Sequence, residues 1–458
     1  MKPDMTRSND LTRRDFLKGA SVATAMTMLG GIELLRPASK ADEAPSMQGP
    51  PVPLAVIGLG VWGRELLATL TRIPEAQIAA VCDTYPAFLR RAGRMAEKAE
   101  QVSDYRKILD NKDIKAVIIA TPTHLHKEIA LETLQAGKHV YCEAPLATTV
   151  EDARAIALAA KKAPTLVFQA GLQHRADPQH AFVLKFIRSG AIGKPLLARA
   201  QWFKKQSGRL TAPTPEREKE VNWRLDPATS IGLVGEWGVH QVDLACWFLG
   251  TLPLAAGGWG ALRLWTDGRT LPDTEQVVFE YPDQVLGLWQ GTLANSFLGS
   301  HEVYYGSDAA ILIRDQRAWL FKEVDAPLLG WEVYASKQTI LDETGIVLRA
   351  DASKAVQETG GKAAEAQAPK PPSKTTLEWA LGNFLTNVNS VSGAVEDYAA
   401  SFDIKDTAAL TKYLAEIRRE PAAGYLEGYQ ATVCAIKANE AIRAGRRITF
   451  SKEWFDLS

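Results

Sequence analysis

The stretch Leu54–Gly63 limits the possible folds of this chain more than any other stretch. It reads LAVIGLGVWG, an apolar run that breaks into Gly58-x-Gly60-x-x-Gly63 and leads into a helical pattern over Arg64–Leu70. In such a strand, turn and helix, Gly58 allows the tight turn, Gly60 lets the backbone approach a pyrophosphate, and Gly63 lets the helix pack closely on the strand. The phosphates of a dinucleotide would face the free N–H groups of the helix N-terminus.

A second apolar run supports this interpretation. It covers Ile78–Cys82 and ends in Asp83, twenty residues after Gly63. A carboxylate at this place hydrogen-bonds the ribose 2′-hydroxyl and repels a 2′-phosphate. The sequence therefore predicts NAD(H) as the cofactor in preference to NADP(H).

The hydrophobic patterns change along the chain. Helical and strand patterns alternate up to about residue 169, which predicts a parallel, doubly wound sheet. Alternation of apolar and polar residues at 197–203, 276–281, 285–293 and 310–313 then predicts a second, mostly antiparallel sheet. We expect an α/β protein with a nucleotide-binding domain over 53–173 and a C-terminal α/β domain over 174–458, in which the polar stretch 351–373 is a flexible insertion.

The N-terminus carries a targeting pattern. TRRDFLK at 12–18 is followed by an uncharged stretch over 19–32 and by small residues before a cut after Ala41. Residues 1–41 thus resemble a twin-arginine signal peptide, and the apolar stretch is shorter than the ~20 residues of a membrane span. The resemblance implies that the export machinery passes the folded protein to the periplasm or beyond, so a cofactor must travel tightly bound. Residues 42–52 are expected to be a linker.

Composition excludes other classes of function. Lys plus Arg and Asp plus Glu both number 53, and no large basic cluster occurs, so no nucleic-acid partner is expected. The four cysteines lie far apart and show no metal-ligand spacing, so neither a metal site nor a disulfide framework is predicted.

Polar residues follow the predicted strands of the first domain. Thr121, Pro122, His124 and His126 come after the strand near 116–120. Ligands of open α/β sheets bind at the carboxyl ends of strands, so both histidines are candidates to touch nicotinamide or substrate, although a helix-capping or surface role is also open. The expected cofactor-binding residues are Gly58, Leu59, Gly60, Trp62, Gly63, Asp83, Thr121, Pro122, His124, His126, Glu143 and Ala144.

The ordered set of motifs resembles the glucose–fructose oxidoreductase and inositol dehydrogenase (Gfo/Idh/MocA) family. The set is GLGVWG, CDTYP, ATPTHLH, GKHVYCEAPLA, GLQHR, IRSGAIGKP, GEWGVHQVD and GYQATVCAIKANEAIRAGRRITF, and it covers most of the chain from Pro53 onward. The resemblance implies a Rossmann domain followed by an α/β domain whose open sheet forms one wall of the active site.

Two positions depart from the family pattern. The E-K-P motif of the family falls on Glu143-Ala144-Pro145, so Ala144 replaces a lysine that in the family helps bind the nicotinamide ribose and relays a proton. An alanine methyl can do neither. The later block begins with Glu236, where the family has Asp.

His240 is the candidate acid/base group that the resemblance implies. An imidazole titrates near neutral pH and can take a proton from a hydroxyl. On a single helix Glu236, His240 and Asp243 would share one face, so we expect one of the carboxylates to orient the ring. A structural histidine packed beneath tryptophans and a metal site on the same face are the alternatives.

Polyhydroxylated ligands need hydrogen-bonding side chains and a flat face for stacking. Gln173, Trp223 and Arg224 are the predicted substrate-binding residues.

The family resemblance leaves three candidate functions: an oxidoreductase acting on a sugar or cyclic polyol with tightly bound NAD(H), an NAD-dependent glycosidase that works by transient oxidation and elimination, or a non-catalytic sugar- or nucleotide-binding relative. A homo-oligomer is expected.

Overall fold

The computed structural model describes residues 49–330, 332, 335–350 and 374–458. The predicted signal peptide, most of the predicted linker and the predicted insertion at 351–373 lie outside the described residues. Among the described residues, no helix combines the length and the apolar character needed to cross a membrane.

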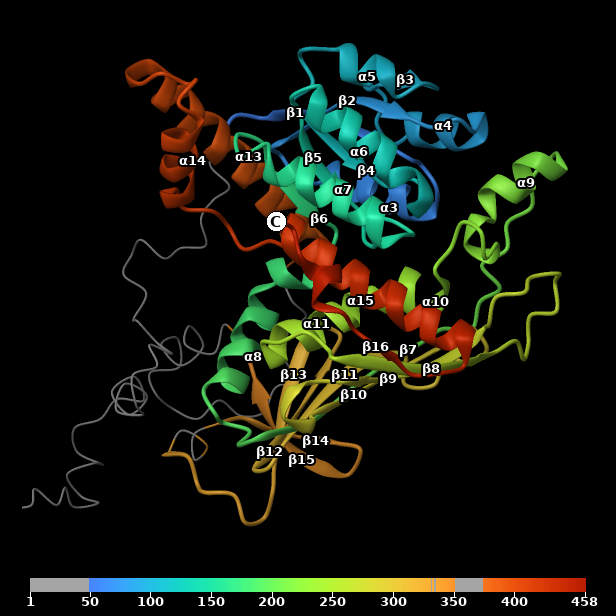
Figure 1. Cartoon of the computed structure of the whole chain (residues 1–458), viewed down its shortest axis with the longest axis vertical. Coiled ribbons are helices and arrows are strands. Elements are labelled where there is room, and N and C mark those ends of the chain that lie inside the picture. Colours follow the sequence, from blue (N-terminus) through green and yellow to red (C-terminus); the bar gives the residue numbers. More distant parts are fainter. Residues whose placement is uncertain (1–48, 331, 333–334, 351–373) are drawn as a thin grey trace, which may run out of the picture.

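The N-terminal domain is a six-stranded parallel sheet with the order β3-β2-β1-β4-β5-β6 (Figure 1). This confirms the predicted doubly wound sheet, although β1 begins one residue before the expected domain start. The order reverses direction between β1 and β4, and ligands of such sheets bind beyond the carboxyl ends of the strands at this point. The strands are β1 (Val52–Ile57), β2 (Ala76–Cys82), β3 (Glu100–Val102), β4 (Ala116–Ile119), β5 (His139–Cys142) and β6 (Phe168–Ala170). The helices are α3 (Val61–Leu70), α4 (Pro86–Gly93), α5 (Arg106–Asp110), α6 (His126–Gln135) and α7 (Val150–Lys161).

Strand β1 is buried on both faces because its side chains alternate between two cores. Ala55 and Ile57 belong to one cluster, whereas Leu54 and Val56 belong to the other. This explains why β1 reads as a continuous apolar run in the sequence.

The last part of the chain returns to the first domain. Helix α13 (Thr376–Ser401) packs Leu381 and Phe384 into the same cluster as Leu54, and α14 (Thr407–Glu416) packs on α13. Helix α15 (Tyr425–Ala444) joins the two domains, because its Val433 is buried in the core of the first domain and its Cys434 in that of the second.

The C-terminal domain is built on a ten-stranded sheet with the order β14-β15-β13-β12-β11-β7-β10-β9-β8-β16. Strands β7 and β10 pair in parallel and the other neighbours pair antiparallel, which confirms a mostly antiparallel sheet. Its strands are β7 (Pro195–Phe203), β8 (Ala255–Ala261), β9 (Thr274–Glu280), β10 (Leu286–Thr292), β11 (Ser300–Gly306), β12 (Ala309–Arg314), β13 (Arg317–Lys322), β14 (Lys337–Ile340), β15 (Glu343–Leu348) and β16 (Ile448–Thr449).

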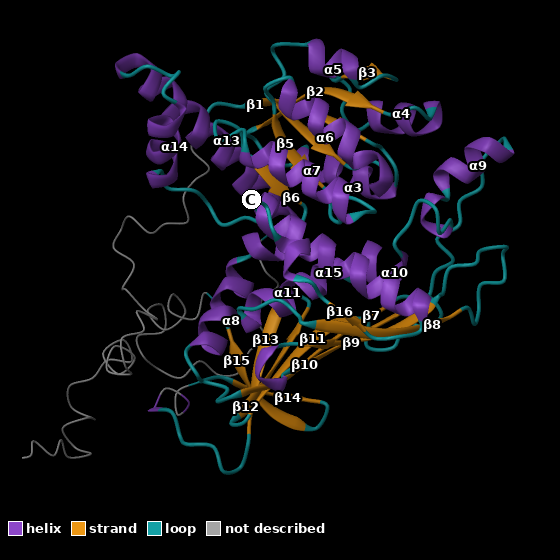
Figure 2. Cartoon of the chain, in the orientation of Figure 1, coloured by secondary structure: helices purple, strands orange, loops and turns teal. Residues whose placement is uncertain are grey.

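Helices α8 (Pro178–Arg188), α10 (Gly232–Glu236), α11 (Val239–Leu249) and α15 lie between this sheet and the first domain (Figure 2). Helix α9 (Pro215–Val221) extends away from the sheet. The four cysteines are all buried and free.

Candidate active site

The three glycines of the first turn meet different surroundings. Gly58 has a φ of +91°, and a Cβ there would lie 2.6 Å from the backbone of Ala120. A Cβ at Gly63 would collide with the carbonyl oxygen of Gly58. A Cβ at Gly60, by contrast, would meet no atom within 4 Å. The first and third glycines thus serve the packing of the chain, and the second leaves open the space that a pyrophosphate needs.

Asp83 is held beside this turn by backbone groups. Its Oδ2 accepts the Leu59 N–H at 2.7 Å, and its Oδ1 accepts the Tyr85 N–H at 2.7 Å. Burial raises the pKa of the Asp83 carboxyl, and the two N–H groups oppose that rise. The carboxylate is therefore fixed where a ribose hydroxyl would bind. The side chain of Leu59 is fully buried, so this predicted residue is engaged with the protein itself.

The carboxyl ends of β4 and β5 present polar atoms without partners. Thr121 Oγ1 and Glu143 Oε1 are buried and have no hydrogen-bond partner among the described residues. Burial raises the pKa of Glu143 to about 7, although Trp62 and the backbone of Ala144 act in the other direction. Pro122 directly precedes the short 3₁₀ turn Thr123–Leu125. With the open turn at Gly60, these orphaned atoms fit a dinucleotide that spans β1, β4 and β5.

The two histidines after β4 are placed differently. His124 is exposed, and its ring centroid lies 6.2 Å from that of Trp223 in the C-terminal domain. His126 is buried, with Nδ1 at 3.0 Å from the Pro145 carbonyl oxygen and Nε2 at 2.9 Å from that of Thr121. The prediction that His126 touches the cofactor is therefore wrong, because both ring nitrogens face backbone carbonyls.

The prediction that Glu236, His240 and Asp243 share one face of a single helix is also wrong. Helix α10 ends at Glu236 and α11 begins at Val239, with Trp237 at a φ of −125° between them. Gly238 is needed at this break, because a Cβ there would lie 2.6 Å from the Val234 carbonyl oxygen and 2.7 Å from the Trp289 ring.

Each carboxylate has a partner other than His240. Glu236 accepts the Thr123 hydroxyl at 3.1 Å and the Ile231 N–H at 3.2 Å, so it links the two domains. Asp243 accepts two side-chain donors of Arg175, Nε at 2.9 Å and Nη2 at 2.8 Å. Neither one hydrogen-bonds the imidazole of His240, contrary to the expectation that a carboxylate orients the ring.

His240 lies near other polar side chains that have an atom without a hydrogen-bond partner in the described structure. His240 is partly buried, its Nδ1 has no hydrogen-bond partner among the described residues, and burial lowers its pKa to about 4. The His174 ring lies 6.1 Å away in a T-shaped arrangement, and its Nδ1 is likewise unpartnered within the described part of the chain. Gln173 Oε1, on the same 3₁₀ turn as His174, is a third such atom.

His174 was missed from the sequence, although it stands just after β6 and the rule that selected Thr121 and Glu143 applies to it. Burial lowers its pKa well below the usual value, and the neighbouring His180 and His240 lower it further. At neutral pH the His174 and His240 rings are therefore both uncharged, and each can accept a proton.

Trp223 and Arg224 lie where the domains meet. The Arg224 guanidinium stacks over Trp223 at 4.3 Å and over Trp237 at 5.6 Å, and its Nε is 3.8 Å from Glu236 Oε2. A planar cation and an indole beside His124 suit a ligand with hydroxyl groups and a ring face. No group of three or more potential metal-ligating side chains occurs within the described ranges.

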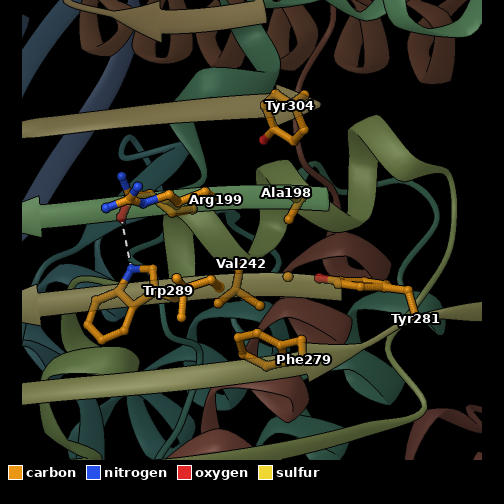
Figure 3. A pocket seen from close by; sticks show the side chains of 12 residues that line it. Ala198, Arg199, Val242, Phe279, Tyr281, Trp289 and Tyr304 are labelled. Atoms are coloured by element: carbon orange, nitrogen blue, oxygen red, sulfur yellow. Dashed lines mark hydrogen bonds between the residues drawn. The ribbon is translucent and has the colours of Figure 1, made fainter. Parts of the chain in front are cut away.

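A small cavity occupies the core of the C-terminal domain on the opposite face of α11 from His240. It measures roughly 20 Å³, and its wall includes Ala198, Phe279 and Tyr281 (Figure 3). Trp289 Nε1 donates to Gln241 Oε1 at 2.8 Å along one side. A cavity of this size holds a water molecule rather than a sugar, so it is not a candidate substrate site.

Comparisons with known families agree with this geometry. The model described as "Oxidoreductase family, NAD-binding Rossmann fold" matches residues 52–170, and that of the GFO/IDH/MocA C-terminal domain matches residues 180–311. Together the two ranges span more than half of the chain. A model of the twin-arginine translocation signal sequence matches residues 10–30.

Individual relatives are sugar and polyol dehydrogenases. Levoglucosan dehydrogenase of Pseudarthrobacter phenanthrenivorans is 33% identical over 171 residues, 37% of this chain and 42% of that protein. Inositol 2-dehydrogenase 2 of Saccharopolyspora erythraea is 30% identical over 234 residues, 51% of this chain and 64% of that protein. The chain thus spans about half the length of the curated relatives that it matches.

A solved structure shares the fold over a longer range. Levoglucosan dehydrogenase in complex with NADH and levoglucosan superposes with a TM-score of 0.64 at 20% identity, over 88% of this chain and 100% of the other.

Proposed function

The chain belongs to the GFO/IDH/MocA oxidoreductase family, and from this membership we propose that it is an exported dehydrogenase that oxidises a CH–OH group of a sugar or cyclic polyol with NAD(H) that stays bound. The observation that carries the proposal is a pair of half-sites on two domains, which are joined by the bond between Thr123 and Glu236. The open turn at Gly60 with Asp83 belongs to the first domain, and the unpartnered His240 belongs to the second.

Different residues of the chain would bind different parts of the cofactor. The turn Gly58–Gly63 and the N-terminus of α3 would bind the pyrophosphate, and Asp83 would bind the adenosine ribose. Thr121 Oγ1 and Glu143 Oε1 would hydrogen-bond the nicotinamide half, since both are buried without a partner in the described structure. A bound NAD⁺ would supply the hydride acceptor for the carbon that carries the hydroxyl.

His240 then has one task, which is to take the hydroxyl proton. Because burial lowers its pKa to about 4, the ring is neutral at pH 7 and free to accept that proton. Ala144 supplies no amine nearby, so the proton cannot pass to the lysine that the family pattern has there. His174, whose ring lies 6.1 Å from that of His240, is the neighbouring base.

An NAD-dependent glycosidase is the second candidate, and Ala144 favours it. Transient oxidation acidifies a neighbouring C–H bond and permits elimination, and the cofactor is restored within the same cycle. Such an enzyme needs no second redox substrate, which suits an exported protein. A non-catalytic sugar-binding relative is the third candidate.

The deciding experiment uses the purified mature protein. It is incubated separately with free sugars, cyclic polyols and glycosides, and NADH absorbance and released sugar are followed. NADH formation or its consumption by a second sugar supports the dehydrogenase, and sugar release without net redox change supports the glycosidase. Binding without either reaction leaves the sugar-binding relative.

The outer face of the C-terminal sheet supports the proposed homo-oligomer. Val278, Leu286 and Trp259 point away from the helix-covered core, and they are 37%, 46% and 65% exposed. Exposed apolar side chains among polar ones on a sheet face are suited to contact with a second copy of the chain. Light scattering after gel filtration would give a mass of two or more chains.

The twin-arginine signal match implies export across a membrane. We propose the periplasm as the destination. Fractionation of cells that express the full chain, and its retention in the cytoplasm when Arg13 and Arg14 are replaced by lysine, would test this.

A further inference from the structure

Residues 204–231, between β7 and α10, form a long excursion that we call the strap. Helix α9 lies within it, and Figure 1 shows α9 standing clear of the C-terminal sheet at the level of the first domain. Nothing in the reaction proposed above uses α9. Its position therefore needs a separate explanation.

The two legs of the strap are tied to each other and to the domain from which they leave. The Asn222 side chain accepts the Leu210 N–H at 2.7 Å and donates to the Leu210 carbonyl at 2.7 Å. Arg209 bonds Glu218 at 2.9 Å and lies 3.3 Å from Asp267. These contacts hold the strap, and α9 within it, in one position.

Helix α9 of the strap contacts the first domain through Arg217. Its Nη1 donates to Thr84 Oγ1 at 3.2 Å and its Nη2 to the Thr84 carbonyl at 3.4 Å. The guanidinium also lies 5.1 Å from the centre of the Tyr85 ring, a cation–π distance. Glu220 pairs with Arg217 at 2.6 Å and fixes its direction along the helix.

The residues that Arg217 contacts stand at the end of the dinucleotide site. Thr84 and Tyr85 directly follow Asp83, and the Tyr85 N–H is one of the two donors that hold the Asp83 carboxylate. Arg217 is close enough to lower the pKa of that carboxyl, against the larger effect of burial. A charge from the C-terminal domain therefore lies at the place where the adenosine ribose would bind.

The strap also reaches the other end of the site. Trp223 lies beside His124, and Arg224 lies near Glu236, which itself bonds Thr123 of the first domain. The strap thus spans the boundary between the domains from the β2 end to the β4 end. A dinucleotide bound along these strand ends would lie under it.

We propose that the strap retains the dinucleotide, with Arg217 as the latch on the adenosine side. This inference rests on the proposed function, since it presumes that NAD(H) is the resident cofactor. Thr84 is exposed and the bonds to it are long for charged donors, so the latch can open without disturbing either core. Release of the dinucleotide requires Arg217 to leave Thr84 and Tyr85.

The test measures release rather than activity. Mature protein is loaded with NADH, mixed with excess NAD⁺, and the loss of bound NADH fluorescence gives the dissociation rate constant. We expect Arg217→Ala to raise this constant about tenfold or more, the scale of a lost charge-assisted contact. Thr84→Val, which removes one acceptor only, should raise it less.

Lys219→Ala is the matched control. Lys219 is on the same helix and is 79% exposed, and it lies 3.9 Å from Asp226 of the strap itself. Lys219→Ala removes one positive charge, as Arg217→Ala does, but breaks no contact with the first domain. We therefore expect the wild-type rate constant for NADH dissociation. Thermal unfolding of each variant verifies that the fold is kept, and Thr84→Val decides the matter if Arg217→Ala unfolds.

The outcomes separate the two proposals. Equal rate constants for the wild type, Arg217→Ala and Thr84→Val overturn the strap as a latch and leave the cofactor assignment intact. A wild-type protein that binds no NADH overturns both. An equal acceleration by Lys219→Ala would assign the effect to charge in general and would also overturn the latch.

Discussion

Arg175 and Asp243 form a two-point ion pair that fixes the turn after β6 against α11. The carboxylate is 3% exposed, and the Nη2 to Oδ1 distance is 2.8 Å. The residue before Arg175 is His174, and Asp243 is one helical turn beyond His240. The pair therefore sets the position of the two uncharged imidazoles relative to each other.

Breaking this pair should destabilise the protein strongly. Asp243→Ala leaves a largely buried guanidinium without its carboxylate, a change that typically costs about 3–5 kcal/mol of unfolding free energy. Urea unfolding followed by fluorescence measures it. Arg106→Ala is the control, because its ion pairs with Glu128 and Glu132 are largely solvent-exposed and their loss should cost about 1 kcal/mol or less. Equal effects of the two variants would contradict a structural role for the buried pair.

Alanine at the second and third glycines of the turn should separate binding from folding. Gly63→Ala places a methyl against the Gly58 carbonyl and should cost about 1–3 kcal/mol of stability. Gly60→Ala meets no protein atom, so stability should change by less than about 0.5 kcal/mol. NADH affinity should nevertheless fall at least about tenfold, because the methyl takes the space of the pyrophosphate. Calorimetry and NADH titration of both variants provide the readout, and unchanged affinity in Gly60→Ala would contradict the cradle.

The sequence was sufficient for the parts of the fold that local patterns govern. Gly58, Gly63 and Asp83 lie within one strand, turn, helix and strand unit, whose spacing is visible in the sequence, and Gly63 packs on Gly58 while Asp83 accepts the Leu59 N–H of the same unit. Helix α15 was likewise predicted from its pattern, and buried residues recur along it from Gly428 to Ile442. The apolar pattern predicts a strand over 165–169, whereas β6 begins three residues later at Phe168, because residues 164–166 form a turn after α7.

The site residues depended on contacts that periodicity does not contain. The break at Trp237 removed Glu236 from the face of His240, and the Trp289 ring, about fifty residues away in the chain, lies so close to the next residue that only glycine fits there. Likewise, Arg217 reaches Thr84 across 133 positions, and the pairing of Arg175 with Asp243 spans 68. These partners follow from the docking of two domains and not from either local pattern.

The stability should fall as the pH is lowered from about 6.5 to about 4, partly through His126. Burial lowers its pKa to about 4 in the folded protein, while the unfolded chain titrates near the ordinary value of 6.5. Between these values the unfolded state binds more protons, so stability is full above about 6.5 and is lost as the pH falls through the folded pKa. The contribution is up to about 2–3 kcal/mol.

His126→Asn isolates that contribution. The variant is less stable at pH 7.5, because it loses a contact to a backbone carbonyl, but its unfolding free energy should change less between pH 7.5 and pH 5 than that of the wild type. His124→Asn, at an exposed position, is the comparison and should reduce the dependence less than His126→Asn does, although burial lowers the pKa of His124 as well. An unaltered pH dependence in His126→Asn would show that other groups account for the acid sensitivity.

The last prediction concerns the proton at the reacting hydroxyl. With Ala144 in place of a lysine, acid/base work falls on His240, and general bases typically contribute about 10²–10⁴-fold. His240→Ala should therefore lose turnover on that scale with the identified substrate, yet bind NADH with unchanged affinity, because His240 belongs neither to the dinucleotide cradle of the first domain nor to the strap. Ala144→Lys should alter the balance between oxidation and elimination without lowering stability, since Ala144 is only partly buried. If His240→Ala keeps wild-type turnover while His174→Ala loses it, the base is His174, and the neutral ring of His240 only positions the substrate.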